Sequence, residues 1–167
     1  FDTLRSLGIS DKEKIITEKN NEFEDKIHIF SQGHDSLIRT AFKMFLDKPL
    51  IGHGPRMFRL KCDNDLYRTG KHYCDTHPHN YYIQLLAETG LLGATFIFVA
   101  LIYLLTNIFF ILFKKKKVSD FEICLISSVL IFLWPLSPNG NFFNNWMLVI
   151  NSIPVGFYLA SQIKINT

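Results

Sequence analysis

The fold is decided by residues 77–93, which read HPHNYYIQLLAETGLLG. A polar segment with several histidines and arginines ends in this stretch, and a long apolar segment begins. The apolar segment runs from Leu91 to Phe113 almost without charge, and a helix of that length crosses a hydrocarbon core of roughly 30 Å. The sequence therefore predicts a membrane helix that directly follows a polar loop able to carry chemistry.

The composition also indicates a membrane protein. Of the 167 residues 48% are hydrophobic and 16 are phenylalanine, with a mean hydropathy of +0.13, which is too apolar for a soluble domain of this size. The net charge is only +3 and the lysines form local clusters, so nucleic acid is not an expected partner. Because the chain starts without Met or a signal sequence, we expect a C-terminal fragment whose upstream membrane helices are missing.

Charge and hydropathy together predict a topology. The four lysines at 114–117 should be cytoplasmic by the positive-inside rule, which puts the histidines on the external side. Two more apolar segments flank a Ser-Pro-Asn-Gly-Asn turn at 137–141. The predicted fold is an all-α, polytopic membrane protein with these parts: a polar linker at 1–34, an external (periplasmic) helical loop at 35–90, three transmembrane helices within 91–160 (91–113, 121–136 and 142–160), and a cytoplasmic tail at 161–167.

The external loop should begin with an amphipathic helix. Asp35 or Ser36 can cap it, apolar residues recur at helical spacing as far as Leu46, and Pro49 ends it. Arg39 lies on the opposite, charged face. Two interpretations stay open: the helix lies on the membrane surface with its basic face toward anionic head groups, or it is a surface helix packed on a soluble domain with its charged face in solvent.

A glycine-rich turn follows at residues 52–55, and Arg56 and Arg59 come directly after it. Backbone N–H groups of such a turn and the guanidinium groups of arginines both suit phosphate oxygens. The structural alternative is that the segment is only a turn.

The cysteines of the polar loop allow two interpretations. Cys62 and Cys74 either form a disulfide that holds the loop under His77, or remain free thiols. The loop also contains five potential zinc ligands, but their spacing matches no zinc-binding pattern and we expect no metal. These ligands are Cys62, His72, Cys74, His77 and His79.

His79 is the candidate general base. With Thr76 as N-cap and Pro78 in the first turn, His79 would lie at a helix N-terminus. The partial positive charge there disfavours the imidazolium, so His79 could accept a proton. The structural alternative is that His79 caps the helix or packs at an interface.

A polar row follows His79 along the same helix. Asn80, Gln84 and Glu88 are spaced four residues apart, and Glu88 stands so close to the bilayer boundary that it needs a partner or a wet cavity. Gly90 and Gly93 allow close approach of another helix or a bend before the buried segment.

Residues 79–93 resemble the signature of the O-antigen ligase and O-antigen polymerase superfamily of bacterial inner-membrane glycosyltransferases. That signature is His-Asn, nine residues, then Gly-x-x-Gly, and this chain has it at His79-Asn80 and Gly90–Gly93. The Pro-Leu-x-Gly-x-Gly turn at 49–54 after Arg39, and the stretch at 138–146, are also similar, so the resemblance covers roughly residues 35–160. Ala94-Thr95 differs from the two threonines of some ligases, which weakens the choice of ligase over polymerase.

The resemblance implies an all-helical enzyme that transfers a glycan from undecaprenyl diphosphate to a glycan or to lipid A core, without metal or cofactor. By position, His79 would assist the acceptor hydroxyl and Arg39 would hold the donor diphosphate. Arg56 and Arg59 could add charge, while His77, Asn80 and Glu88 would orient the site. The expected location is the bacterial inner membrane, and the isolated fragment is expected to be inactive. Two alternatives remain, a protein O-oligosaccharyltransferase of the same superfamily and a non-catalytic transporter or assembly subunit.

Overall fold

The computed structural model describes residues 31–114 and 117–166, and this part of the chain is helical with no strand. Residues 1–30 of the predicted linker at 1–34 therefore lie outside the described part of the chain. The helices are α2 (Gln32–Asp47), α3 (Phe58–Lys61), α4 (Tyr81–Lys114), α5 (Asp120–Leu133) and α6 (Asn145–Asn166).

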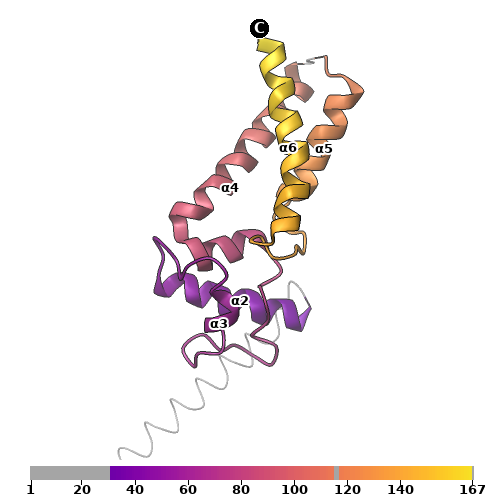
Figure 1. Ribbon diagram of the computed structural model, residues 1–167. Helices are drawn as coiled ribbons and strands as arrows, with labels where there is room; N and C mark the ends of the chain where they lie inside the picture. The colour runs from indigo at the N-terminus through magenta and orange to yellow at the C-terminus, as the bar shows by residue number, and fades with distance from the viewer. Residues whose placement is uncertain (1–30, 115–116, 167) are drawn as a thin grey trace, which may run out of the picture.

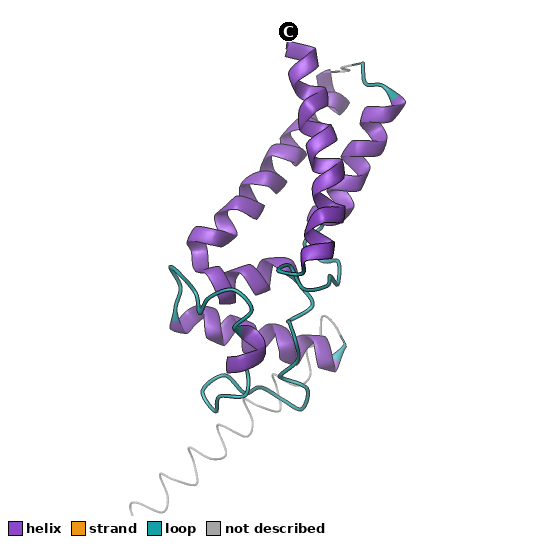
Figure 2. Cartoon of the chain, viewed as in Figure 1, coloured by secondary structure: helices purple, strands orange, loops and turns teal. Residues whose placement is uncertain are grey.

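The helices form two regions that α4 connects (Figure 1). One region holds α2, α3 and the first turns of α4, and the long loops gather there (Figure 2). The other holds the long arm of α4 beside α5 and α6. The first region, called the external region below after that prediction, holds the residues of the predicted external loop, and the second contains the apolar helices.

α2 begins at Gln32, three residues before the predicted cap Asp35, and ends at Asp47, as the proline at 49 predicted. Its apolar residues Leu37, Ala41 and Met44 are buried in a cluster with Ala87 of α4. These residues therefore face protein, so the helix packs within the external loop as the second of the two interpretations proposed.

α4 bends sharply at Gly90, whose backbone is not helical (φ 65°, ψ −166°). The bend leaves backbone groups of α4 without their helical partners, and the Pro49–Gly54 turn supplies new ones. Four hydrogen bonds join the two segments: Leu91 N to Pro49 O (2.8 Å), Leu92 N to Leu50 O (3.2 Å), His53 N to Ala87 O (3.1 Å) and Gly54 N to Glu88 O (2.7 Å). The bend predicted from the glycines is thus a backbone joint between two distant segments.

Among the described residues, α4 is the one helix both long and apolar enough to cross a membrane, with a mean hydropathy of 2.6 in its most apolar window. The predicted 121–136 segment is a shorter helix, because Trp134 is extended ahead of Pro135 and ends α5 at Leu133. Its 14 residues measure about 21 Å at a rise of 1.5 Å per residue. α6 begins at Asn145 and contains Pro154, so the three-span topology stays a prediction.

Candidate active site

His79 lies in a loop and not in the first turn of a helix. α4 begins at Tyr81, and the side chain of Asn80 caps it by accepting hydrogen bonds from the backbone N–H groups of Tyr82 (3.0 Å) and Ile83 (3.2 Å). The prediction that Thr76 caps the helix was wrong. The physical reason is the backbone of His79, whose φ of 56° is left-handed and interrupts the helix before it can extend back to Thr76.

The imidazole of His79 has three close neighbours. Its Nε2 lies 3.4 Å from Oδ2 of Asp75, and its ring centre lies 4.1 Å from that of His77 and 5.3 Å from that of His34 on α2. The backbone oxygen of His79 accepts a hydrogen bond from Asn139 N (2.9 Å) in the segment between α5 and α6. Three segments far apart in the chain therefore meet at this histidine.

The charges around His79 suit a proton acceptor. A hydrogen bond from the Thr76 backbone (2.6 Å), with a further contribution from His79, lowers the pKa of Asp75. Burial, and secondly the neighbouring His79, lower the pKa of His77. An ionised Asp75 beside Nε2 favours the tautomer that carries its proton there, which leaves Nδ1 of His79 with the lone pair.

The three candidate arginines lie in three places: α2, the turn before α3, and α3. On α2, Arg39 donates from Nε to Asp35 Oδ2 (2.8 Å). Arg56 donates to the backbone oxygen of Phe143 (3.1 Å from Nε), and Arg59 is exposed on α3. Since Phe143 and Asn139 belong to the same segment, the residues between α5 and α6 contact both Arg56 and His79.

The polar row on α4 is buried and joins three segments. Asn80 donates to Pro135 O (2.7 Å), and Gln84 donates to Asn141 Oδ1 (2.8 Å). Glu88 accepts from Phe58 N (2.8 Å) and from Gln84 Nε2 (3.0 Å). Glu88 thus has polar partners although it is buried, and the row holds α3 and the α5–α6 segment against α4.

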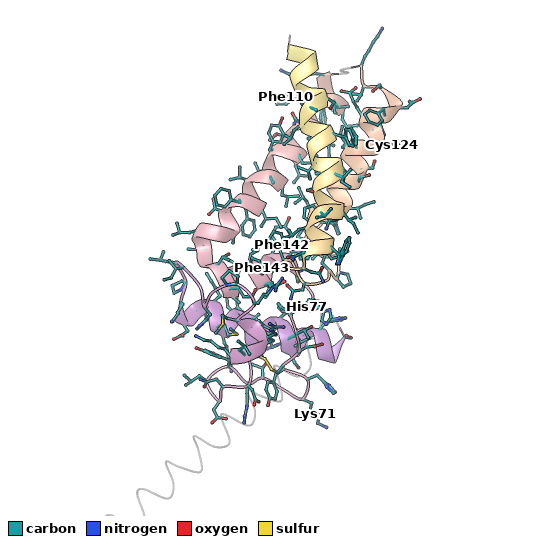
Figure 3. The ribbon with its side chains drawn as sticks, viewed as in Figure 1. Lys71, His77, Phe110, Cys124, Phe142 and Phe143 are labelled. Carbon is teal, nitrogen blue, oxygen red and sulfur yellow. A yellow bond between two sulfur atoms is a disulfide. The ribbon has the colours of Figure 1, made fainter. Side chains whose placement is uncertain are left out.

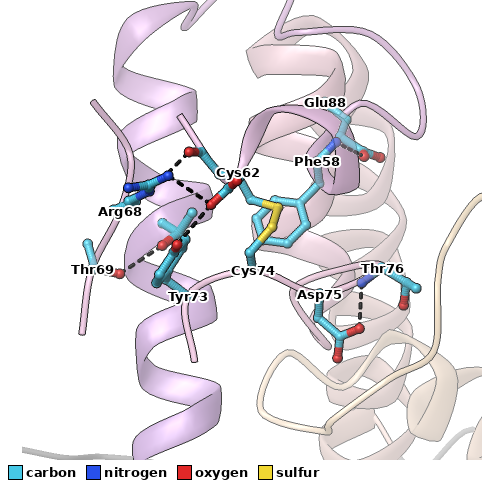
Figure 4. The surroundings of a disulfide bond; sticks show 11 residues. Phe58, Cys62, Arg68, Thr69, Tyr73, Cys74, Asp75, Thr76 and Glu88 are labelled. Carbon is cyan, nitrogen blue, oxygen red and sulfur yellow. Dashed lines mark hydrogen bonds and ion pairs between the residues drawn. A yellow bond between two sulfur atoms is a disulfide. The ribbon is translucent and has the colours of Figure 1, made fainter. Parts of the chain in front are cut away.

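A disulfide joins Cys62 to Cys74, with 5.2 Å between their Cα atoms (Figure 4). Cys62 is buried in the α2 cluster, while Cys74 immediately precedes Asp75. The bond therefore anchors the loop that carries Asp75 and His79 to the core of the external region, as the disulfide interpretation proposed. His77 follows in the same loop and is labelled in Figure 3.

In the described part of the chain, no group of three or more histidine, cysteine, aspartate and glutamate side chains could hold a metal ion. The sequence analysis missed Asp75 and His34 as neighbours of His79. Asp75 could have been proposed as an acid four residues before a candidate base. His34 gave no signal, because it fell in the predicted linker.

Residues 31–99 match the family model described as O-antigen ligase. The match includes α2, the Pro49–Gly54 turn, His79 and the bend of α4. No curated protein and no solved structure matches the chain.

Proposed function

We propose, from the match of residues 31–99 to the O-antigen ligase family model, that the chain is part of an integral membrane glycosyltransferase. The enzyme transfers a glycan from undecaprenyl diphosphate to a glycan or to lipid A core in surface polysaccharide synthesis. His79 is the general base, and Arg39, Arg56 and Arg59 bind the donor diphosphate.

The backbone conformation of two residues carries this proposal. Among the described residues, the non-glycine residues with positive φ are Arg56 (61°) and His79 (56°). Such conformations cost free energy and concentrate at functional sites, where the surrounding structure enforces them. One is the candidate base and the other a candidate diphosphate ligand, and the α5–α6 segment contacts both. Such placement supports a common site at this junction.

The chemistry needs few protein groups, because diphosphate is a good leaving group. Nδ1 of His79 accepts the proton of the acceptor hydroxyl as its oxygen bonds to the anomeric carbon. The bond from that carbon to the diphosphate oxygen breaks, and the electron pair leaves with the undecaprenyl diphosphate. Arginines balance the charge on the departing diphosphate. His77, Asn80 and Glu88 orient the site without reacting.

The proposed topology puts this site in the periplasm of a bacterial inner-membrane protein. A disulfide in the external loop suits an oxidising compartment, and the lysines after α4 suit the cytoplasm. α5 and α6 pack with the long arm of α4 in one apolar cluster, which supports three membrane helices and a cytoplasmic C-terminus.

The test compares variants of the full-length protein in a bacterium that lacks its own copy, with a gel profile of surface polysaccharide as the readout. His79→Asn and His79→Gly both tolerate positive φ but remove the imidazole. We expect both to lose glycan transfer while they insert normally. His72→Asn is the matched control, since His72 is an exposed histidine of the same loop.

Each outcome has a distinct meaning. A restored ladder of long chains indicates a polymerase, and addition in a single step indicates a ligase. Transfer to protein instead of glycan selects the protein O-oligosaccharyltransferase. Full transfer by His79→Asn excludes His79 as the base and favours a structural role for the loop.

A further inference from the structure

Within residues 31–114 and 117–166, large apolar side chains near the bend of α4 are exposed. The exposed fractions are 62% for Leu50, 70% for Ile51, 65% for Leu92 and 81% for Phe96. We call these four residues the apolar patch. Leu50 and Ile51 belong to the turn that packs against the bend, and two consecutive aliphatic residues this exposed would be costly in water.

The loop part of the patch is held firmly against α4. Leu91 N and Leu92 N donate to the backbone oxygens of Pro49 and Leu50. The backbone of Gly90 also packs directly against Leu50 and Ile51. Leu50 and Ile51 therefore have a fixed height relative to the long arm of α4, and the turn that carries them lies beside the bend (Figure 1).

The height of this turn can be compared with the apolar arm of α4. The long arm of α4 starts at Leu91, and it is the apolar part of the one helix that can cross a membrane. Leu92 and Phe96 are four residues apart and thus share a face of this arm. Leu50 and Ile51 lie beside the first residues of this arm, because Leu92 N donates to the backbone oxygen of Leu50.

We propose that Leu50 and Ile51 insert into the outer leaflet of the bilayer, so that the apolar patch binds lipid. The partner is a lipid surface and not a soluble protein, because Leu92 and Phe96 of the patch belong to the helix that is long and apolar enough to cross a membrane. Lys48, exposed two residues before Leu50, can extend its ammonium group toward lipid head groups. This contact fixes the external loop at the membrane, independently of the glycosyltransferase reaction.

The test uses a fluorescent probe on single cysteines of the full-length protein in nanodiscs, in a Cys124→Ser background. Ile51→Cys carries the probe, and the nanodiscs contain phospholipid with a spin label near the top of the acyl chain. Phe96→Cys is the positive control on α4. Lys71→Cys is the negative control, because Lys71 is exposed at the end of the external region farthest from the helical bundle (Figure 3).

We expect the spin-labelled lipid to quench the probe at Ile51 about as strongly as that at Phe96, and to leave the probe at Lys71 bright. A probe at Ile51 that behaves like the one at Lys71 would overturn the proposal. A probe at Ile51 whose emission shifts to the blue without quenching would also overturn the proposal, because that result would mean that protein covers the patch. Leu50→Cys repeats the measurement if Ile51→Cys does not retain the Cys62–Cys74 disulfide.

Discussion

Gly52 and Gly90 lie backbone against backbone. A Cβ atom on Gly52 would come within 2.5 Å of the carbonyl carbon of Glu88, and one on Gly90 would collide with the Leu50 carbonyl group. Both residues have positive φ, 64° and 65°. The glycines of two separate sequence motifs thus form one joint, which fixes the Pro49–Gly54 turn to the bend of α4.

Substitution at this joint should destabilise the protein strongly. Gly90→Ala adds a collision with backbone to a left-handed conformation, and together these should cost at least about 2 kcal/mol. Gly52→Ala should behave similarly. Thermal unfolding in detergent measures the effect. Gly156→Ala is the control, because a Cβ atom there meets nothing within 4 Å, and equal unfolding temperatures for Gly90→Ala and Gly156→Ala would contradict the joint.

Loss of the disulfide should release the loop that carries His79. Cys62 and Cys74 are 12 residues apart, and a disulfide that closes a loop of this size contributes about 3 kcal/mol in the chain-entropy description. We expect Cys74→Ser to lower the unfolding temperature and to reduce glycan transfer. Cys124→Ser, which removes a free cysteine, should change neither. If reductant left the unfolding temperature of the wild-type protein unchanged, the disulfide would not have this stabilising role.

Asp75 should assist His79 without binding substrate. Asp75→Asn replaces a charge-assisted hydrogen bond worth about 1.5 kcal/mol, which corresponds to about a tenfold loss of rate. The loss should appear in kcat with little change in KM. Asp65→Asn is the control, since Asp65 is an exposed carboxylate of the same loop that pairs with Arg68 (2.8 Å). A proportional rise in KM would instead indicate that Asp75 contacts a substrate.

Acid should destabilise the external region through its buried histidines. Burial lowers the pKa of His53, whose Nε2 bonds the Met44 oxygen (2.9 Å), and burial also lowers the pKa of His77. The unfolded chain therefore binds protons at higher pH than the folded protein, so the free energy of unfolding falls as pH drops below about 6.5. Denaturant midpoints between pH 7 and pH 5 should show this decline.

The variant His77→Gln should weaken the pH dependence, because it removes one of the two groups. His72→Gln should leave the dependence unchanged, since His72 is exposed. A slope that is identical in wild type and His77→Gln would assign the acid sensitivity to other groups.

Local sequence patterns predicted several elements correctly. Pro49 stops α2, the glycine at 90 allows the bend, and the apolar run after it makes the long arm of α4. These features depend on neighbours in the chain, namely a missing N–H, a missing Cβ and a continuous set of apolar side chains. The resemblance to the ligase and polymerase superfamily rested on equally local spacing, and the family match over residues 31–99 confirms it.

Other predictions failed because the deciding contacts come from elsewhere. Thr76 looked like a helix cap, but the left-handed backbone of His79 gives that role to Asn80, which also donates to Pro135 in the α5–α6 segment. Asp75 and His34 are neighbours of His79 only because the disulfide loop and α2 pack together in the folded protein.

Residue types and their spacing alone determine which segments of this protein are helical, where the apolar arm begins and which histidine is the best candidate base. Tertiary structure alone decides what surrounds that base and what the motif glycines do. The reason is that periodicity, proline and glycine act within a few residues. The Gly52–Gly90 joint, the polar row and the neighbours of His79 instead need groups brought together by packing.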